Sequence, residues 1–282
     1  MSVLAVMAPG AALAQSGAEL LDTEGGRTPT VEPVPYEQPR VASVSRPTQT
    51  DRADLVHEGW LEMEFGWSQA FAERNLQVGT VQAKYAPLDI LEVRLGWDIF
   101  GVLGPLDRDV AGLDESDAGV GDLFAAAKIG IPLDIDEPER HRLAVLTTLR
   151  PGIGQQPVTV DGLNLGAFAV YSTFPGPVEV DVQAGVQLRG IFETAYVDLP
   201  LSSAVRWRAL PWLSAVGEVA ETLTFEDLNE SQTSLLVGAL FHASDALVFD
   251  ASTSLGLSES LPDAVLQLGL TWLAAPVSGP DS

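Results

Sequence analysis

GPVEVDVQAGVQLRG, residues 176–190, alternates between apolar and polar side chains. Val180 and Val182 belong to the apolar row, and Glu179 and Asp181 belong to the polar row. Successive side chains of a β-strand point to opposite faces, so the stretch is an extended strand with one apolar face and one wet face. What lies against the apolar face is either a protein core or lipid, and the rest of the sequence decides between them.

The composition excludes several classes of function. The 15 Lys and Arg residues against 39 Asp and Glu residues give a net charge of −24, which repels nucleic acid. The chain has no cysteine, so it has neither disulfides nor a thiolate metal site. The three histidines, His57, His141 and His242, do not share a ligand spacing. The sequence therefore predicts no metal site and no cofactor.

The two ends of the chain differ from its middle. Residues 1–14 hold an apolar run that ends in Ala12-Leu13-Ala14, which is typical of a signal-peptide cleavage site; the basic n-region is missing, as in a truncated leader. Residues 15–54 are rich in Pro, Thr and Ser without periodicity and predict a disordered periplasmic tether. Residues 274–282 are expected to form a C-terminal tail. No stretch is long and apolar enough for a transmembrane helix.

Between residues 55 and 273 the alternation returns in twelve segments. They are about ten residues long, which is the length needed to cross a bilayer at a tilt of about 45°. Strands of a soluble sandwich are more usually about five or six residues long. Short turns alternate with longer loops along the chain, as in outer-membrane barrels. One segment, residues 234–242, is apolar on both faces and remains ambiguous.

The placement of charged and aromatic side chains indicates that the apolar face contacts lipid. All Lys and Arg residues inside the expected strands fall on the wet face, and a lipid-facing Arg or Lys at mid-bilayer costs about 2–4 kcal/mol. A soluble sandwich would show the same parity, so the length of the strands and the placement of the tryptophans distinguish the two. Trp97, Trp207, Trp212 and Trp272 near strand ends are typical of an aromatic girdle. Because lipid excludes an open sheet edge, the sheet must close. The sequence predicts an all-β fold: a closed antiparallel transmembrane β-barrel of about 12 strands in the outer membrane.

The wet face of these strands supplies the candidate site residues. Acids and bases nearly balance there, so most of the negative charge lies in the loops and the tether. For each residue, pairing across a narrow, filled lumen is the alternative to a role in selectivity. The lumen-lining candidates are Glu62, Glu64, Lys84, Glu92, Arg94, Asp98, Lys128, Arg150, Glu179, Asp181, Arg189, Arg206, Arg208, Glu218 and Asp250.

Two motifs carry a family resemblance. GVGDLFAAAKIGIPL, residues 119–133, and LVFDASTSLGLSESLPDAVLQLGLTW, residues 247–272, resemble the Gly-x-Gly-Asp strand and the last hairpin of the outer-membrane transporter family associated with the meta-pathway of phenol degradation. The resemblance implies a β-barrel that admits small, often aromatic or apolar, compounds. The chain departs from the pattern at its end: such barrels usually end on an aromatic residue that the assembly machinery reads, and this chain continues past Trp272 into AAPVSGPDS.

Three functions are compatible with the sequence. The first is a passive channel for small, aromatic or apolar molecules, and the second is a structural or adhesive barrel whose loops bind a partner. The third, a lipid hydrolase, is disfavoured because the histidines are expected near the periplasmic ends of different strands, so we expect no catalytic residue and no enzyme. The expected partners are outer-membrane lipid, an unidentified small-molecule solute and the barrel assembly machinery.

Overall fold

The structure, a computed structural model, describes residues 42, 44–46, 48–71, 76–103, 118–155, 159–160, 162–192, 195–225, 231–258 and 260–274. The chain divides into two units, Met1–Glu37 and Gln38–Ser282, and every described residue belongs to the second unit. Among these residues no helix is long and apolar enough to cross a bilayer. The expected signal peptide lies outside the described residues, as does the C-terminal tail beyond Ala274.

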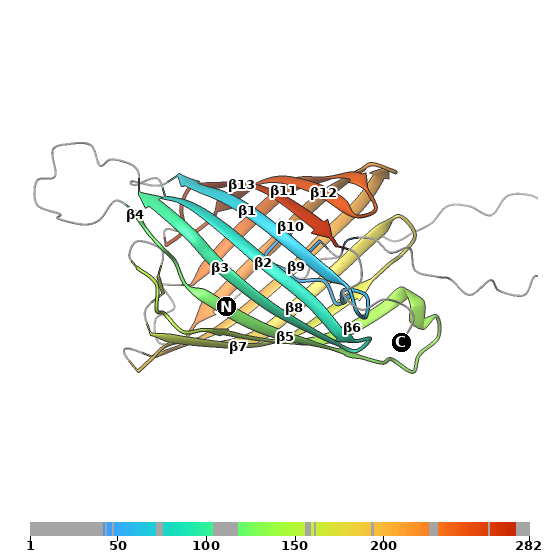
Figure 1. Cartoon of the computed structure of the whole chain (residues 1–282), viewed down its shortest axis with the longest axis horizontal. Helices are drawn as coiled ribbons and strands as arrows, with labels where there is room; N and C mark the ends of the chain where they lie inside the picture. Colours follow the sequence, from blue (N-terminus) through green and yellow to red (C-terminus); the bar gives the residue numbers. More distant parts are fainter. Residues whose placement is uncertain are drawn as a thin grey trace, which may run out of the picture. The chain divides into compact units, whose positions relative to one another are not determined.

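The described part of the chain forms one sheet of twelve long antiparallel strands and a two-residue strand, β4 (Figure 1). The strands are β1 (Leu61–Phe71), β2 (Leu76–Leu88), β3 (Leu91–Leu103), β4 (Ala118–Gly119), β5 (Leu123–Ile131), β6 (His141–Arg150), β7 (Leu163–Thr173), β8 (Val178–Ile191), β9 (Tyr196–Leu210), β10 (Leu213–Thr224), β11 (Gln232–Ser244), β12 (Leu247–Gly256) and β13 (Ala264–Leu273). β1 pairs with both β2 and β13, and β2 also pairs with β3, so the sheet closes on itself. The predicted closed antiparallel barrel is confirmed.

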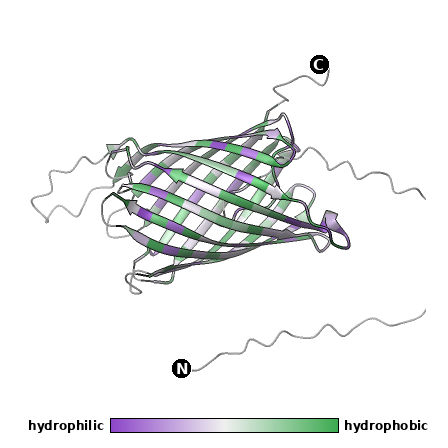
Figure 2. Ribbon diagram, turned by 90° about the horizontal axis from the view of Figure 1, so that it is seen from below, coloured by the Kyte–Doolittle hydropathy of each residue, from purple (hydrophilic) through white to green (hydrophobic). Residues whose placement is uncertain are grey.

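The strands turn their apolar row outward and their charged row inward. In β8, Val182 and Val186 are each 45% exposed, whereas Asp181 is completely buried. Figure 2 shows the same alternation of hydrophobic and hydrophilic residues along the strands. A single-layer wall has no core of its own, so apolar side chains exposed all around the outside must face lipid.

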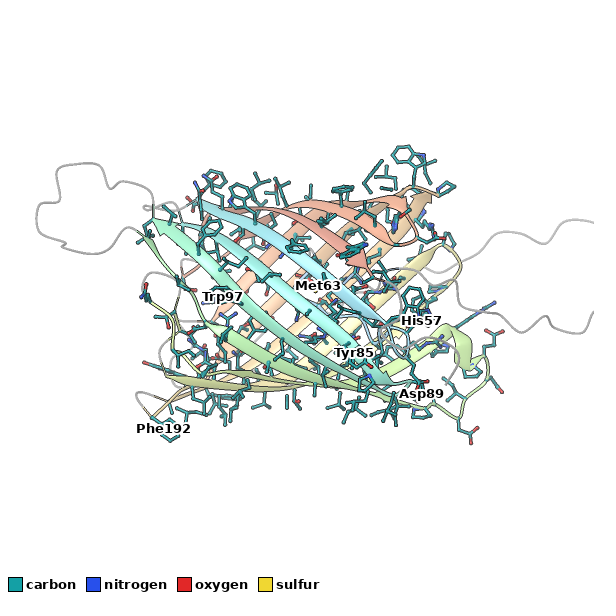
Figure 3. All side chains as sticks on the ribbon, viewed as in Figure 1. His57, Met63, Tyr85, Asp89, Trp97 and Phe192 are labelled. Atoms are coloured by element: carbon teal, nitrogen blue, oxygen red, sulfur yellow. The ribbon has the colours of Figure 1, made fainter. Side chains whose placement is uncertain are left out.

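The two ends of the barrel differ in their connections. The turns β2–β3, β9–β10 and β11–β12 are two residues each, and they lie at the end where β1 begins and β13 ends. We call this the short-turn end; its exception is the β5–β6 connection, residues 132–140, which contains the 3₁₀ helix Pro138–Arg140. In Figure 3, His57 and Asp89 lie at this end and Phe192 lies at the opposite, long-loop end. By the sequence argument the short-turn end is periplasmic.

Tryptophans mark the short-turn end of the outer surface. Trp207, Trp212 and Trp272 are about half exposed and lie at or beside strand ends there. The indole of Trp212 meets the ring of Phe241 edge-on at 5.7 Å between centroids. Such rings anchor a barrel at the membrane–water interface, and these three agree with the predicted placement. Trp97, which was predicted to lie near a strand end, lies instead in the interior of β3.

Residues 42–58 depart from the expected tether. Ala42 N donates to the carbonyl of Asp245 in the β11–β12 turn (2.9 Å), and Gly59 N donates to the carbonyl of Ala86 on β2 (2.7 Å). Between these two points, both at the short-turn end, the chain contacts inward side chains of strands all around the barrel, so it lies inside the lumen (Figure 1, blue). We call the described residues of 42–58 the plug segment. For them the prediction of a disordered tether over 15–54 is corrected; residues 15–41 lie outside the described part.

Apolar packing explains why this segment is ordered. Ala42, Val44 and Val56 of the plug segment are buried in one cluster with Leu236 and Leu240 of β11. These leucines point inward, while the alternate residues of the strand are exposed to lipid. The ambiguous segment 234–242 is therefore apolar on both faces because one face meets lipid and the other meets the plug segment.

A matched pair of substitutions on β8 tests this orientation. We expect Val186→Arg to prevent insertion, because an outward arginine costs about 2–4 kcal/mol in lipid, and Gln187→Arg to be tolerated, because Gln187 is inward and only partly buried. The measurement is the difference in gel migration between boiled and unboiled outer-membrane fractions. Equal folding of the two variants would contradict the assignment of faces.

Candidate functional site

A glutamate of the wall binds the middle of the plug segment, where the chain turns back toward the short-turn end. Gln49 N and Thr50 N donate to the two carboxylate oxygens of Glu218 on β10, at 3.0 and 2.7 Å. Thr50 is completely buried. A backbone without strand partners must satisfy its N–H groups elsewhere, and a carboxylate that accepts two of them is a strong clamp. Glu218 therefore fixes how far the plug segment reaches into the lumen.

Asp51 is the centre of the charge network beside this clamp. Its carboxylate accepts from Arg94 of β3 and lies 3.5 Å from Lys128 Nζ of β5. Burial alone would raise the pKa of Asp51, but the charges of Arg94 and Lys128 outweigh it and hold that pKa well below its ordinary value. Because the pKa is lowered, these ion pairs stabilise the plug segment fully at pH values above the unfolded pKa of about 3.9. This stabilisation is lost only as the pH falls toward the lower pKa of the folded state.

Lys128 and Glu92 bind the returning arm of the plug segment through its backbone. Lys128 Nζ donates to the carbonyls of Arg52 (3.1 Å) and Asp54 (2.5 Å). Glu92, completely buried on β3, accepts from Val56 N (2.7 Å). An anion and a cation of the wall thus satisfy buried donors and acceptors of an irregular chain.

A lysine of β2 ties the entering arm to β1. Lys84 Nζ lies 3.0 Å from Glu62 and 2.6 Å from Glu64, and it donates to Ser45 Oγ at 2.7 Å. Ser45 N donates in turn to Glu64 (3.1 Å). All three charged side chains are almost completely buried. Paired and hydrogen-bonded burial of this kind is the condition under which charges are tolerated away from water.

The other side of the lumen carries a second ion cluster. Arg206 of β9 donates to Asp181 of β8 and to Thr48 Oγ1 (2.6 Å), while Arg52 Nε donates to Glu179 (2.5 Å). The same wall satisfies the plug backbone: Asp51 N donates to Gln183 Oε1 (2.9 Å) and Ala53 N to Ser172 Oγ (2.8 Å). The plug segment is therefore held from both sides.

Two glycines make room for an arginine of the plug at the seam where the barrel closes. Gly66 of β1 and Gly269 of β13 are cross-strand partners. A Cβ at Gly66 would lie 1.9 Å from Arg46 Nη1, and one at Gly269 would lie 2.8 Å from Arg46 Nε. Arg46 Nε is 3.8 Å from the buried carboxylate of Asp250. Any larger residue at these glycines would displace the arginine from the seam.

Above the plug segment the lumen becomes accessible. At plug level the inward Ala144, Val170 and Ser172 are completely buried. Toward the long-loop end most inward side chains of β1, β2 and β5–β8 are partly exposed, whereas Thr224, Ser234, Ser252 and Ser254 of β10–β12 remain buried. We call this half the outer vestibule, and its partly exposed residues include Thr80, Phe124, Thr148, Arg150, Phe168 and Gln187. Its floor is the plug segment.

The predicted lumen residues fall into three groups. Those at plug level are Glu62, Glu64, Lys84, Glu92, Arg94, Lys128, Glu179, Asp181, Arg206, Glu218 and Asp250, while Asp98, Arg150 and Arg189 line the outer vestibule. Arg208 has the same parity as Arg206, but it is exposed at the short-turn end, where it donates to the carbonyl of Pro211 (2.9 Å). The prediction gave Arg208 a face of its strand but no depth, because alternation alone does not determine depth.

Sequence reasoning missed Asp122, the last residue of the GVGD motif. Asp122 is completely buried and accepts from Gly154 N (2.7 Å), Val160 N (2.8 Å) and Thr159 Oγ1 (3.1 Å). It thereby orders the described residues of the β6–β7 connection at the rim of the vestibule. The aspartate directly before a strand was the available signal.

A separate hollow lies on the outward side of this rim. Its volume is about 460 Å³, and it is lined by Trp97 of β3, Leu123 of β5 and Ile153 of the following connection, among others. These three side chains are all exposed on the outer surface. The hollow thus opens on the lipid-facing side and is not part of the vestibule.

The histidines give no support to hydrolysis. His242 Nε2 lies 3.1 Å from Ser214 Oγ at the short-turn end, and no hydrogen bond joins His242 to a carboxylate in the described residues. His141 instead contacts the hydroxyl of Tyr171 (2.6 Å). No group of three or more His, Asp or Glu residues in the described ranges is arranged to hold a metal ion.

Comparison with solved structures gives the class of fold. An outer-membrane channel from Pseudomonas putida F1 superposes with a TM-score of 0.58 at 14% identity, covering 79% of this chain and 98% of that one. The KdgM porin in complex with disordered oligogalacturonate gives a TM-score of 0.51 at 5% identity, covering 74% and 98%. At these identities the likeness shows the fold alone, which is that of outer-membrane channels and porins, and the predicted outer-membrane location is confirmed.

No protein-family model matches the chain, and no curated protein matches it. The narrower resemblance to the phenol-degradation family is therefore not confirmed. What is established is an outer-membrane barrel whose lumen contains part of its own N-terminal region.

Because the chain lacks cysteine, an introduced thiol reports on the plug segment alone. We expect Thr50→Cys to resist a water-soluble maleimide in the folded protein, since Thr50 is completely buried. Phe192→Cys, at a position 90% exposed, is the reactive control.

Adding Asp51→Asn to Thr50→Cys should increase its labelling rate, because removing one partner of a buried ion pair costs about 3–5 kcal/mol. Mass spectrometry of timed samples gives the rates. Equal labelling of positions 50 and 192 in the folded barrel would show that the plug segment does not occupy the lumen.

Proposed function

We propose that the protein is a passive outer-membrane channel for small, aromatic or apolar molecules, in which the plug segment is the barrier. The observation that carries the proposal is the change in exposure along one side of the lumen: on β1, β2 and β5–β8 most inward side chains are partly exposed in the outer vestibule and buried at plug level. An accessible half of the lumen that ends on a non-covalently held segment is what a gated channel requires.

The size of the barrel supports this proposal. Barrels of about 8 strands are filled by their own side chains, and those of about 16–18 strands enclose an open aqueous channel. Twelve strands leave an intermediate interior, which here accommodates one additional segment of chain. Movement of that segment would free a passage without any change in the wall.

The lining of the vestibule supports a small aromatic or apolar solute. Phe124 and Phe168 point inward and are partly exposed, whereas Ala144, Leu146 and Val170 below Phe168 are buried together with Ala53 of the plug segment. Apolar side chains on the wet face of a barrel strand are unusual unless something covers them. A solute with an apolar body would cover this wall during transit.

A structural barrel without transport is the second candidate, and the tight seating of the plug segment favours it. Hydrolysis has no comparable support, so the proposal is of a protein that is not an enzyme. The partners we propose are outer-membrane lipid, which the apolar outer surface would contact, the barrel assembly machinery and an unidentified small-molecule solute.

A reversible lock on the plug segment separates the two candidates. Ala53 N donates to Ser172 Oγ (2.8 Å), so the two residues are in direct contact, and we choose the pair Ala53→Cys and Ser172→Cys for a disulfide between the plug segment and the wall. In planar bilayers we expect the oxidised double variant to remain closed and a reductant to restore the openings of the parent protein.

The two single-cysteine variants are the controls, and a reductant should not alter their currents. Equal current through the oxidised and reduced double variant would mean that the plug segment is not the barrier. A complete lack of current and of solute uptake in every form would exclude the channel and leave the structural barrel.

A further inference from the structure

Arg150 presents a positive charge to the outer vestibule. Its Nη2 is 3.2 Å from Asp98 Oδ2, and its Cζ lies 5.4 Å from the centre of the Phe124 ring. The arginine side chain is 33% exposed, whereas that of Asp98 is only 10% exposed. The aspartate and the ring fix the guanidinium from behind, and the accessible part of the pair is cationic.

Arg189 repeats this arrangement two strands away. It is bound to Asp198, with Nη2 3.2 Å from Oδ1, and its Cζ lies 5.5 Å from the centre of the Tyr196 ring. The arginine side chain is 37% exposed and that of Asp198 2%. Asp198 also accepts from Thr224 Oγ1 (2.8 Å). A second fixed guanidinium therefore faces the same space.

Strand pairing places the two arginines at the same height. Arg150 of β6 is the cross-strand partner of Asn164 on β7, and Asn164 Oδ1 accepts from Gly190 N, next to Arg189 on β8 (2.9 Å). Neighbouring strands are about 4.8 Å apart, so the backbones of β6 and β8 are separated by roughly 10 Å. Two long side chains at that separation can serve one small ligand.

The wall below Arg150 is apolar or small. Ala126, Thr148 and Gly166 form one inward row across β5, β6 and β7, and Leu146 and Phe168 are partners in the row beneath. The ring of Phe168 lies over Gly185, where a Cβ would come within 2.4 Å of it. An apolar surface therefore continues from the guanidinium toward the floor formed by the plug segment.

We propose that the outer vestibule binds small organic carboxylates with an apolar, ring-sized body, and that Arg150, assisted by Arg189, binds the carboxylate. The planar guanidinium fork matches a carboxylate, and the wall of β5–β7 contacts the body. For a solute in transit this inference rests on the proposed function, but binding itself does not require transport.

Calorimetry on the folded full-length protein in detergent tests binding directly. The probes are benzoate and benzamide, which share a ring but differ in charge. We expect benzoate to bind at least about tenfold more tightly, as for a hydrogen bond to a charged group. Equal affinity for the two probes in the unaltered protein would overturn the proposal, whether or not any variant folds.

Substitution then identifies the group responsible. Arg150→Gln should weaken benzoate roughly tenfold to a hundredfold and leave benzamide unchanged, and Arg150→Lys should fall between them. Arg140→Gln, at an exposed arginine paired with Glu137 outside the lumen, is the matched control and should bind like the parent. Unchanged benzoate affinity in folded Arg150→Gln, or an equal loss in Arg140→Gln, would overturn the assignment.

Planar-bilayer recordings separate this inference from the proposed function. Benzoate added to the long-loop side should interrupt the current in the parent and not in Arg150→Gln. Calorimetric binding without any current would retain the site and exclude the channel. Current that benzoate does not affect, together with no calorimetric preference for it, would retain the channel and exclude the site.

Discussion

A wall one strand thick with lipid on one side leaves its charged side chains a single direction. They must point inward, into a lumen too narrow to solvate them as bulk water would, and there each charge needs a partner. Lys84, Arg94 and Lys128 are almost completely buried, and the strands alone do not supply all of their contacts. The plug segment supplies the rest, and for this reason the barrel and its contents form one structure.

The exchange between wall and plug is reciprocal. Glu64, Glu92, Glu218, Gln183 and Ser172 each accept backbone N–H groups of the plug segment, which has no ladder of its own. In return the plug gives carbonyls to Lys128 and the carboxylate of Asp51 to Arg94. Irregular backbone is found at membrane depth only where protein or water satisfies it, and here side chains do so. The lumen charges thus act first as a framework for the plug.

The sequence predicted the wall and not its contents, for a physical reason. A strand can be recognised in the sequence by its period-2 alternation, because its two faces contact different environments. The plug segment has no such period, since its partners are side chains far away in the chain. The plug segment left one signal in the sequence, which is the apolar residues on the lumen face of the strands that it covers. These are Leu236 and Leu240 of β11 and Val216 and Val248 of the flanking strands. Apolar residues on a lumen face indicate a covering segment.

In the proposed channel, buried ion pairs are a suitable way to hold a barrier that also moves. Such pairs contribute little net stability, because desolvation offsets most of their attraction, yet loss of one partner alone is costly. Withdrawal of the whole plug segment returns its charges to water together and leaves acids and bases of the wall to pair with one another. The segment is therefore fixed in one register while seated, and its concerted release costs less than the sum of its contacts.

In the outer vestibule, the exposure of a charged side chain depends on its depth behind other side chains as much as on the face of the strand that carries it. Asp98 and Asp198 are buried behind Arg150 and Arg189. The four charges sum to zero, but the two arginines are the more exposed partners, so the accessible surface is mainly positive. Alternation could assign all four to the lumen but could not rank their exposure, just as it could not move Arg208 out to the short-turn end. The charge of the accessible surface is determined by which partner of each ion pair is the more exposed. That order comes from side-chain length, since aspartate lies close to the wall and arginine reaches past it.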